Sequence, residues 1–523
     1  MLSRKIKGVR DLFFAIHGEG LHFDVGSFEK LSMARNPVIW ADVPDPSVIR
    51  VGNIYYMSST TMHMNPGVPI MRSKDLVNWE IVNYVYDILD DTDKLALRNG
   101  QNAYGQGSWA SSLRYHDGLY YVGFASYTTE KTYIYRTRDI ENGPWERSVL
   151  DGVYHDLSLL FDDDGRVYMV YGGGDIKLVE LTPDATAIKE GGLNQVIIPN
   201  ASVVASPDVG LPAEGAHIHK INGNYYIFLI TWPRGGMRTE LCFRSERITG
   251  PYEGRVVLAD AGIAQGGLVD TPDGSWYALL FGDRGAVGRI PYLVPVRWED
   301  SWPVLGIDNK VPEALDIAGD NEISGIVRSD EFDGPALDLV WQWNHNPANE
   351  YWSLTDRPGY LRLVNSKCCG GILEAVNTLT QRTFGPRCSG EVAIEVANMK
   401  DGDIAGLAAF QAQYGFVGVK AEGAGKYLVM VNGRGKRPVE AEKIPVTQDR
   451  VYMKIDCDFK NQADRAYFSY SLDGSNWIAI GDVLPISYTI PHFMGYRFAL
   501  FSYATKEPGG YVDFDYFRVS DRF

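Results

Sequence analysis

The 523-residue sequence predicts an all-β protein, a five-bladed β-propeller followed by a β-sandwich. One pattern, a glycine-containing turn followed by an aromatic-rich strand and then a second strand, recurs five times at intervals of roughly 50 to 65 residues, the scale of a propeller blade. Apolar and polar residues alternate as they do in strands, and the spacing of amphipathic helices is nearly absent. An array of ordinary β-sandwich units is the alternative interpretation of the repeats.

The five repeats define a first domain over residues 36–310. Four of them open with Asn-Gly or Asp-Gly, which favour tight turns between antiparallel strands. The repeats begin with "GNIYYMSSTT", "DGLYYVGFASY", "DGRVYMVYGGG", "NGNYYIFLITW" and "DGSWYALLF".

Three further segments complete the chain. Residues 311–327 are polar and poor in aromatics, which indicates a linker. Residues 328–523 contain short alternating runs such as "GYLRLVNS" and "YLVMVNG". Their spacing of about 10 to 20 residues, with turn signals between them, is typical of a β-sandwich. Residues 1–35 fit neither domain and are left as an unassigned N-terminal extension.

The charge of the chain restricts its partners. The formal net charge is −16, and a strongly acidic chain repels nucleic acid and anionic membrane surfaces. No run of about 18 apolar residues occurs, so we expect no membrane span. Aromatic residues are abundant and suit sugar rings as well as β-sheet cores. A neutral ligand is expected, and the sequence leaves the oligomeric state open.

The cysteines indicate a reducing compartment. Their number is odd, no metal-type Cys-X-X-Cys spacing occurs, and a disulfide between two adjacent cysteines would be strained. We therefore expect free thiols and a cytoplasmic protein, or a secreted one if a leader peptide has been removed. The five are Cys242, Cys368, Cys369, Cys388 and Cys457.

Three carboxylates precede predicted inner strands in three different repeats. Asp45 stands between Pro44 and Pro46, which either form a turn or hold the carboxylate rigidly. Asp156 and Glu214 stand in small or apolar surroundings, where a charge is unusual unless it caps a turn. The inner strands of a propeller end around one central pocket, so the three would converge. Two carboxyls on opposite sides of a bond are what glycoside hydrolysis requires, and a third raises the pKa of the acid.

Five motifs resemble glycoside hydrolase family 43, in that family's order and over residues 36–310. The resemblance implies a five-bladed propeller with inverting activity that removes β-xylosyl or α-L-arabinofuranosyl units from plant polysaccharides and oligosaccharides. The tail, with "WQWNHNP" and "YVDFDYFRV", is similar to the concanavalin-like β-sandwich of its xylosidase-type members. The motifs are "DVPDPSVIRVGNIYY", "GSWASSLRYHDGLYYV", "HDLSLLFDDDGRVYMVYG", "EGAHIHKINGNYYIF" and "GRIPYLVPVRWEDSWPVLG".

The resemblance implies a role for each matching residue. Asp45 corresponds to the general base and Glu214 to the general acid. Asp156 corresponds to the carboxylate that tunes the pKa of the acid and orients it. Arg289 corresponds to an arginine that reaches the hydroxyls of the innermost sugar. Asp42 is then interpreted as a turn residue.

Four more residues are candidates for the substrate pocket. Trp109 resembles an aromatic that packs on the sugar, with a core position as the alternative. Met62 stands where related enzymes often carry an aromatic at the pocket mouth. His155 either orients its neighbour Asp156 or simply packs. Gln265 occupies the position of a histidine in the central channel, where some members bind calcium.

No cofactor is expected for the chemistry itself, although calcium is possible as a structural or activating ion. A glutamine is a weak, uncharged ligand for a hard cation, which leaves a central metal in doubt. A second candidate calcium site pairs Glu331 and Asp515 of the sandwich, with solvated surface charges as the alternative.

The function favoured by the sequence is an exo-acting β-xylosidase or α-L-arabinofuranosidase that acts on xylo- and arabino-oligosaccharides from hemicellulose. The loop at residues 503–510 is expected to narrow the pocket. A carbohydrate-binding propeller without turnover, or an endo-acting arabinanase or xylanase of the same fold, is the alternative. A fructan hydrolase is disfavoured because no "WMNDPNG"-like motif occurs near the start.

Overall fold

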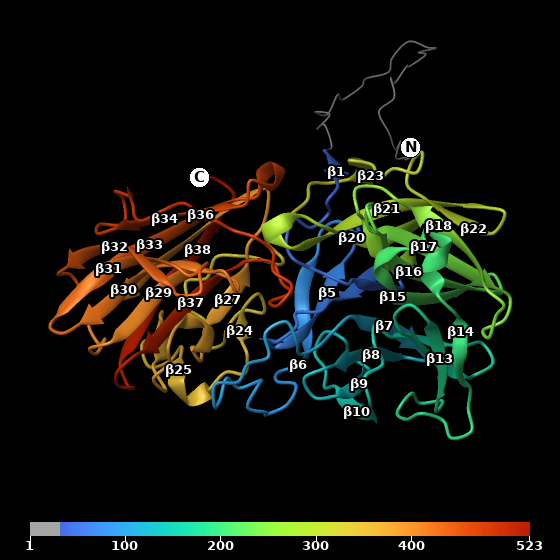
Figure 1. Ribbon diagram of the computed structural model, residues 1–523, viewed down its shortest axis with the longest axis horizontal. Helices are drawn as coiled ribbons and strands as arrows, with labels where there is room; N and C mark the ends of the chain where they lie inside the picture. Colours follow the sequence, from blue (N-terminus) through green and yellow to red (C-terminus); the bar gives the residue numbers. More distant parts are fainter. Residues whose placement is uncertain (1–31) are drawn as a thin grey trace, which may run out of the picture.

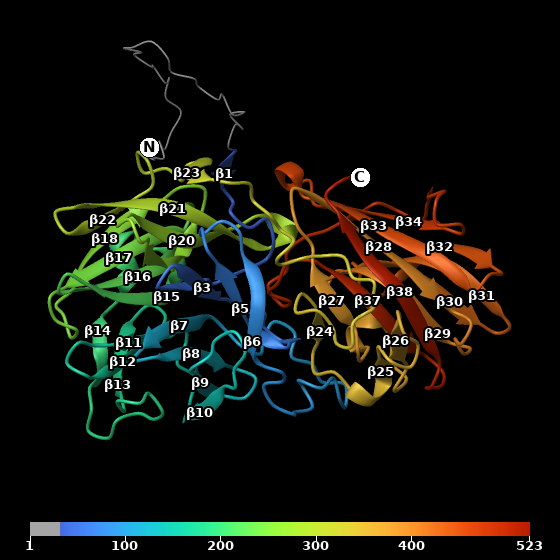
Figure 2. The ribbon, with the colours of Figure 1, turned by 180° about the vertical axis from the view of Figure 1, so that it is seen from behind.

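A computed structural model describes residues 32–523 and confirms the predicted five-bladed propeller followed by a sandwich. Figures 1 and 2 show the two bodies side by side, with the propeller running from blue to yellow-green and the sandwich from gold through orange to red. The predicted extension at residues 1–35 lies mostly outside the described residues. Within residues 32–523 no helix is long and apolar enough to cross a membrane.

Five four-stranded antiparallel sheets follow one another along the chain and form the blades. The first blade consists of β2 (Ser47–Val51), β3 (Ile54–Ser58), β5 (Gly67–Ser73) and β6 (Glu80–Tyr86). The second consists of β7 (Ser111–His116), β8 (Leu119–Ser126), β9 (Lys131–Thr137) and β10 (Glu146–Asp151). The third consists of β11 (Ser158–Phe161), β12 (Val167–Tyr171), β13 (Ile176–Leu181) and β14 (Asn194–Ile198).

The fourth blade consists of β15 (Val209–Ile221), β16 (Asn224–Pro233), β17 (Thr239–Ser245) and β18 (Glu253–Leu258). The fifth consists of β19 (Ala264–Asp270), β20 (Trp276–Asp283), β21 (Arg289–Glu299) and β22 (Trp302–Leu305). The first strands of successive blades contact one another in a closed ring, in the order β2, β7, β11, β15, β19 and back to β2. These five strands surround the propeller axis, so residues at their ends meet although they are far apart in the chain.

Two eight-stranded sheets form the sandwich. The sheet that faces the propeller contains β24 (Gln342–Asn344), β27 (Leu379–Arg382), β29 (Asp403–Phe410), β30 (Gly415–Glu422), β31 (Gly425–Asn432), β32 (Val439–Val446) and β37 (Arg497–Ala504). Its eighth strand, β4 (Met64–Asn65), comes from the first blade and pairs with β24. The other sheet contains β25 (Trp352–Ser353), β26 (Leu361–Val364), β28 (Arg387–Glu395), β33 (Arg450–Asp458), β34 (Arg465–Ser471), β35 (Ile478–Ala479), β36 (Leu484–Pro485) and β38 (Tyr511–Ser520).

Two short strands tie the start of the described chain to the segment after the propeller. β1 (Met33–Arg35) pairs with β23 (Ala314–Ala318), so part of the predicted linker is a strand. The described helices are all single 3-10 turns: η1 (Ala201–Val204), η2 (Gly285–Val287), η3 (Asn349–Tyr351), η4 (Ile372–Glu374) and η5 (Lys460–Gln462).

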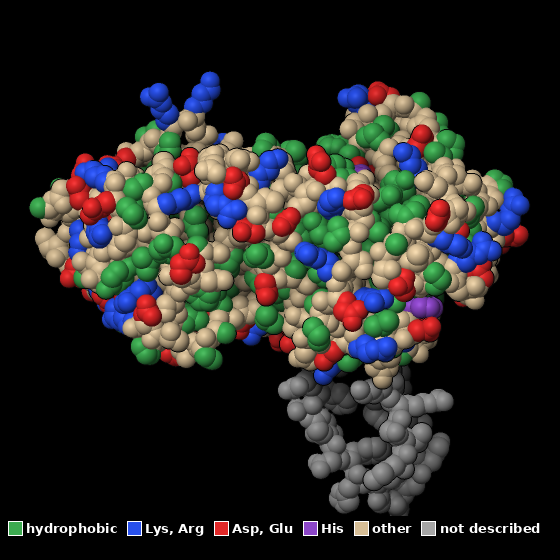
Figure 3. Space-filling view, turned by 90° about the horizontal axis from the view of Figure 1, so that it is seen from below, with side chains coloured by type: hydrophobic (Ala, Val, Ile, Leu, Met, Phe, Trp, Pro, Cys, Tyr) green, Lys and Arg blue, Asp and Glu red, His purple; other side chains and the backbone are tan. Residues whose placement is uncertain are grey.

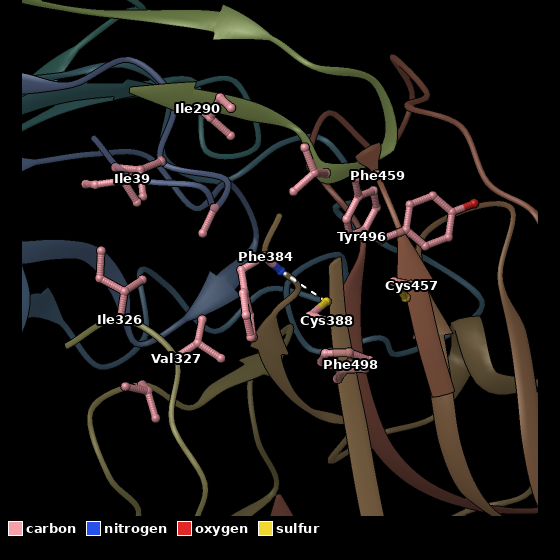
Figure 4. Packing of buried hydrophobic residues seen from close by; sticks show 14 of the residues in the cluster. Ile39, Ile290, Ile326, Val327, Phe384, Cys388, Cys457, Phe459, Tyr496 and Phe498 are labelled. Atoms are coloured by element: carbon pink, nitrogen blue, oxygen red, sulfur yellow. Dashed lines mark hydrogen bonds between the residues drawn. The ribbon is translucent and has the colours of Figure 1, made fainter. Parts of the chain in front are cut away.

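One hydrophobic cluster spans both domains. Figure 4 shows Ile39 and Ile290 of the propeller in the same packed region as Phe384, Tyr496 and Phe498 of the sandwich. Burial of apolar surface across this interface, together with the shared strand β4, stabilises the two domains in a fixed arrangement. The surface, unlike this hydrophobic cluster, is rich in charged residues. Figure 3 shows one face on which acidic and basic side chains are interspersed.

Candidate active site

Asp45 and Asp156 stand in strained turns immediately ahead of the inner strands β2 and β11, as predicted. Their φ angles are 50° and 48°, in the left-handed region that non-glycine residues rarely adopt. Only 6% of Asp45 and 5% of Asp156 is exposed. Such backbone strain persists only where the surroundings fix it, and it is concentrated at functional sites. The prolines beside Asp45 therefore belong to a segment that holds a buried carboxylate in one place.

Glu214 lies within an inner strand and not ahead of one, which corrects the sequence-based expectation. The pairing of β15 with β16 shifts register on both sides of Glu214, so an irregularity places this residue at the pocket. The next residue, Gly215, has a φ of 70°, and a Cβ there would lie 2.7 Å from the side chain of Gln265. The glycine is required for both reasons, and the Glu214 side chain remains 24% exposed.

The three carboxyl groups are close enough to interact electrostatically. Burial raises the pKa of Asp156 to about 7, and the charges of Glu214 and Asp45 add to the effect. Burial also raises the pKa of Asp45, with Glu214 contributing, although the Arg289 guanidinium opposes the change. The structure thus brings the three predicted catalytic residues together at one end of the propeller axis.

Arg289 holds Asp45 in place. Its Nη1 donates to both carboxylate oxygens of Asp45, at 3.0 and 3.2 Å. Its backbone N–H donates to Oδ1 of Asp42 at 2.7 Å. Arg289 is buried, yet its Nε and Nη2 have no partner in residues 32–523. Two charged donors therefore remain free to bind hydroxyl groups of a ligand beside Asp45.

His155 links the other two carboxylates. Its Nε2 lies 3.0 Å from Oε2 of Glu214 and 3.6 Å from Oδ2 of Asp156, while its Nδ1 lies 3.0 Å from the Tyr127 hydroxyl. Burial lowers the pKa of His155, but the two carboxylates outweigh it and raise the pKa to about 9. This pKa favours the imidazolium form at neutral pH, in which Nε2–H donates to Oε2 of Glu214. This supports the orienting role that the sequence left open.

The sandwich contributes an aromatic wall that the sequence did not reveal. The Phe493 ring stacks on Trp109, with centroids 5.5 Å apart, and covers the Arg289 guanidinium at 4.5 Å. The indole nitrogen of Trp109 has no hydrogen-bond partner among the described residues, and the ring also borders His155. The predicted position of Trp109 at the site is consistent with these contacts. Phe493 is more than 380 residues from Trp109 in the chain, and no local pattern marks it.

Two expectations about the pocket rim need correction. Met62 is 1% exposed and packs in an apolar cluster with Phe410, Phe416 and Met494, so it fills the domain interface and does not line the mouth. The loop at residues 503–510 bonds back to Asn365 within the sandwich. Phe493, on a different loop, is the sandwich residue that covers the site.

The side chain of Arg114, from the inner strand β7, lies in the central channel of the propeller. Arg114 is partly buried and donates to the carbonyl oxygens of Leu159 at 2.7 Å and Ile218 at 3.1 Å, which belong to the next two blades. Burial and the Arg114 charge lower the pKa values of His217, to about 3, and His219. Neutral imidazoles beside a fixed cation do not suit calcium, which prefers oxygen ligands.

The sandwich pair does not form a calcium site, and the contacts of Gln265 are to protein groups. The backbone N–H of Gln265 donates to Glu240 at 2.7 Å, and its side chain packs under Gly215. Glu331 forms a two-pronged ion pair with Arg518, at 2.8 and 2.9 Å. Asp515 pairs with a different arginine, Arg450. Within residues 32–523, the one group of three potential ligands whose atoms lie within 4.8 Å is His155, Asp156 and Glu214.

Comparison with known proteins identifies both domains. The model of "Glycosyl hydrolases family 43" matches residues 34–303, and that of the "Beta xylosidase C-terminal Concanavalin A-like domain" matches residues 329–520. A β-xylosidase of Formosa agariphila is 31% identical over 92% of this chain and 89% of its own. A non-reducing end α-L-arabinofuranosidase of Bacteroides ovatus is 33% identical over 63% of this chain and 64% of its own.

Among solved structures, a protein of Bacteroides eggerthii described as a bifunctional GH43-CE is similar to this chain. It is 57% identical to this chain and superimposes with a TM-score of 0.93 over 94% of it. The present chain spans only 64% of the length of that protein.

Proposed function

The chain belongs to glycoside hydrolase family 43, and from that premise we propose that it is an inverting exo-glycosidase that releases xylose, arabinose or both from hemicellulose oligosaccharides. One observation carries the proposal. Asp45 is hydrogen-bonded by Arg289, while Glu214 is hydrogen-bonded by His155. A base and an acid held by different partners suit the two-carboxylate mechanism of glycoside hydrolysis, and inversion is proposed from the family.

In the proposed reaction Asp45 removes a proton from a water molecule as that water attacks the anomeric carbon. Glu214 delivers a proton to the glycosidic oxygen as the bond between carbon and oxygen breaks. Asp156 and His155 orient the acid. After turnover the proton gained by Asp45 returns to solvent and Glu214 is reprotonated. The two carboxyl groups suffice for this chemistry, so no cofactor is proposed.

The aromatic cover supports exo-cleavage. Phe493 and Trp109 stack beside Arg289, so aromatic residues from both domains border the site. Such a wall favours the end of a sugar chain over its middle. The unpartnered donors of Arg289 suit the hydroxyl groups of one terminal sugar. Relatives named β-xylosidase and α-L-arabinofuranosidase make both pentoses candidates.

A cytoplasmic location is part of the proposal. All five cysteines are free, including Cys388 and Cys457, which are directly opposite each other on β28 and β33. Unbonded neighbouring thiols are what a reducing compartment maintains, and short imported oligosaccharides would be the substrate there.

The test uses an aryl β-D-xylopyranoside and an aryl α-L-arabinofuranoside, each with EDTA or added calcium. We expect turnover of at least one substrate, with no dependence on calcium. Asp45→Asn and Glu214→Gln should each lower turnover by roughly 10²- to 10⁴-fold without a change in melting temperature. Glu331→Gln is the matched control and should retain full activity. Proton NMR of the first product should show the inverted anomer, and a retained anomer would refute the mechanism.

A further inference from the structure

The two largest fully buried side chains of the described residues are both arginines, and they are neighbours. Arg382 is 0% and Arg497 2% exposed, and they are paired across β27 and β37 on the sandwich sheet that faces the propeller. Two cations in adjacent positions inside a protein repel each other and lose their hydration. The Arg497 pKa reflects this, since burial and the Arg382 charge lower it to about 9.

Several nitrogen atoms of this pair have no acceptor among residues 32–523. Arg382 donates through Nε to the main-chain oxygen of Asp42 at 2.8 Å, and Arg497 donates through Nη1 to the Thr380 hydroxyl at 3.3 Å. The Nη1 and Nη2 atoms of Arg382 and the Nε atom of Arg497 are buried without a partner in that part of the chain. Buried charged donors are normally hydrogen-bonded, so three such atoms together point to a missing acceptor.

The surrounding residues supply no counter-charge in contact. Neither arginine forms an ion pair within the described residues. The carboxylate of Asp42 acts on both from a distance, but its oxygens accept from the backbone N–H groups of Arg289 and Gly495. The Tyr84 hydroxyl lies close enough to Arg382 for a weak hydrogen bond, but burial raises the pKa of the phenol to about 12, so Tyr84 is neutral and supplies no counter-charge.

Neutral imidazoles border the same region. Burial and the charge of Arg497 both lower the pKa values of His492 and His63, that of His63 to about 3. Among residues 32–523, both ring nitrogens of His492 and Nδ1 of His63 have no hydrogen-bond partner. The neutral ring of His492 therefore has a free N–H donor, and neither histidine supplies negative charge.

We propose that the propeller–sandwich interface binds a small inorganic monoanion of the halide type, such as chloride, between Arg382 and Arg497. A monoatomic anion fits because it accepts from several directions and needs little room in an enclosed core. The anion would neutralise the pair and fix Arg382 against Asp42. Since Asp42 also binds the backbone of Arg289, the ion would support the segment that carries Asp45.

The first experiment measures the melting temperature of the full chain at constant ionic strength while chloride replaces gluconate, an anion too large for the site. We expect a saturable rise of a few degrees, because a ligand that binds only the folded state stabilises it by mass action. Identical melting temperatures in chloride and gluconate would overturn the proposal.

Arg497→Met removes one guanidinium and keeps an apolar side chain of similar length. The variant should lose the chloride response and should be at least as stable as the wild type in gluconate, because a buried unpaired charge has been removed. Arg434→Met, at an exposed position of the sandwich, is the matched control and should keep the wild-type response.

Bromide gives a second readout that needs no variant. Crystals of the wild-type chain soaked in bromide should show an anomalous peak within hydrogen-bond distance of the Arg382 and Arg497 guanidinium groups. Water molecules alone at that position, with no anomalous signal, would refute the anion site even if Arg497→Met fails to fold.

Discussion

Asp42 and Gly495 are 453 residues apart, and Oδ2 of Asp42 accepts the backbone N–H of Gly495 at 3.0 Å. The other oxygen accepts the backbone N–H of Arg289 at 2.7 Å. The Asp42 carboxylate therefore connects two segments: the start of β21, where Arg289 binds Asp45, and the sandwich loop that contains Phe493. The interpretation of Asp42 as a turn residue misses these two contacts, which a buried carboxylate makes with distant parts of the chain.

Asp42→Ala should lower kcat/KM by about 10- to 100-fold, because each hydrogen bond to a charged group contributes roughly 1.5–3 kcal/mol. Asp42→Asn should retain part of the activity, since its amide oxygen can still accept one N–H group. Steady-state kinetics with the preferred aryl pentoside and thermal melting would check both variants. Wild-type kinetics in Asp42→Ala would show that the link does not position the site.

Phe493→Ala should raise KM for small aryl pentosides and lower kcat/KM by about 10-fold. The substitution removes the ring that stacks on Trp109 and the cation–π contact with Arg289, which is worth roughly 0.5–2 kcal/mol. Relative activity on longer or branched oligosaccharides should increase because the cover is gone. The control is Phe523→Ala, at an exposed phenylalanine, and equal losses in both variants would contradict the role of Phe493.

The sequence predicts the site residues that lie within one repeat of the propeller. It does not predict the contacts that form only when the sandwich packs against the propeller. Asp45 and Asp156 could be found because each precedes an inner strand within one repeat. The position of Glu214 was harder to predict, because it depends on register shifts within β15. Phe493 and the second role of Asp42 depend on how the sandwich docks on the propeller. The sequence pattern within one domain does not predict how the two domains dock.

His155→Phe should move the ionisation of Asp156 to higher pH. The imidazolium lowers the pKa of Asp156, which burial raises to about 7, so removing the positive charge favours the protonated acid further. The dependence of kcat/KM on pH would therefore lose or shift its transition near pH 7. His155→Gln keeps a donor to Glu214 without the charge and separates hydrogen bonding from electrostatics. An unchanged pH profile in both variants would exclude coupling through His155.

Met62→Ala should destabilise the protein and leave KM nearly unchanged. Met62 is 1% exposed within an apolar cluster, and removing such a side chain from a core costs about 2–5 kcal/mol. Chemical denaturation and steady-state kinetics would separate the two effects. A large change in KM with unaltered stability would restore Met62 as a residue of the pocket mouth.

Buried neutral histidines should make the domain interface sensitive to acid. His63, His345 and His492 pack together between the domains, with His63 centred 4.6 Å from His345 and 5.4 Å from His492. Burial lowers all three pKa values, that of His63 to about 3. The unfolded chain therefore binds more protons, so the stability is fully present above about pH 6.5 and is lost as the pH falls from there towards 3.

Each of these groups should cost about 1.4 kcal/mol of unfolding free energy per pH unit in that window. Denaturation by urea at pH 7.5, 6.5 and 5.5 would measure the slope. His492→Phe keeps a ring between Tyr104 and Phe410 and should make the slope shallower by about one proton. His116→Gln, at a partly exposed position of the propeller, should leave it unchanged. A slope that His492→Phe does not alter would mean that the acid sensitivity arises outside the interface.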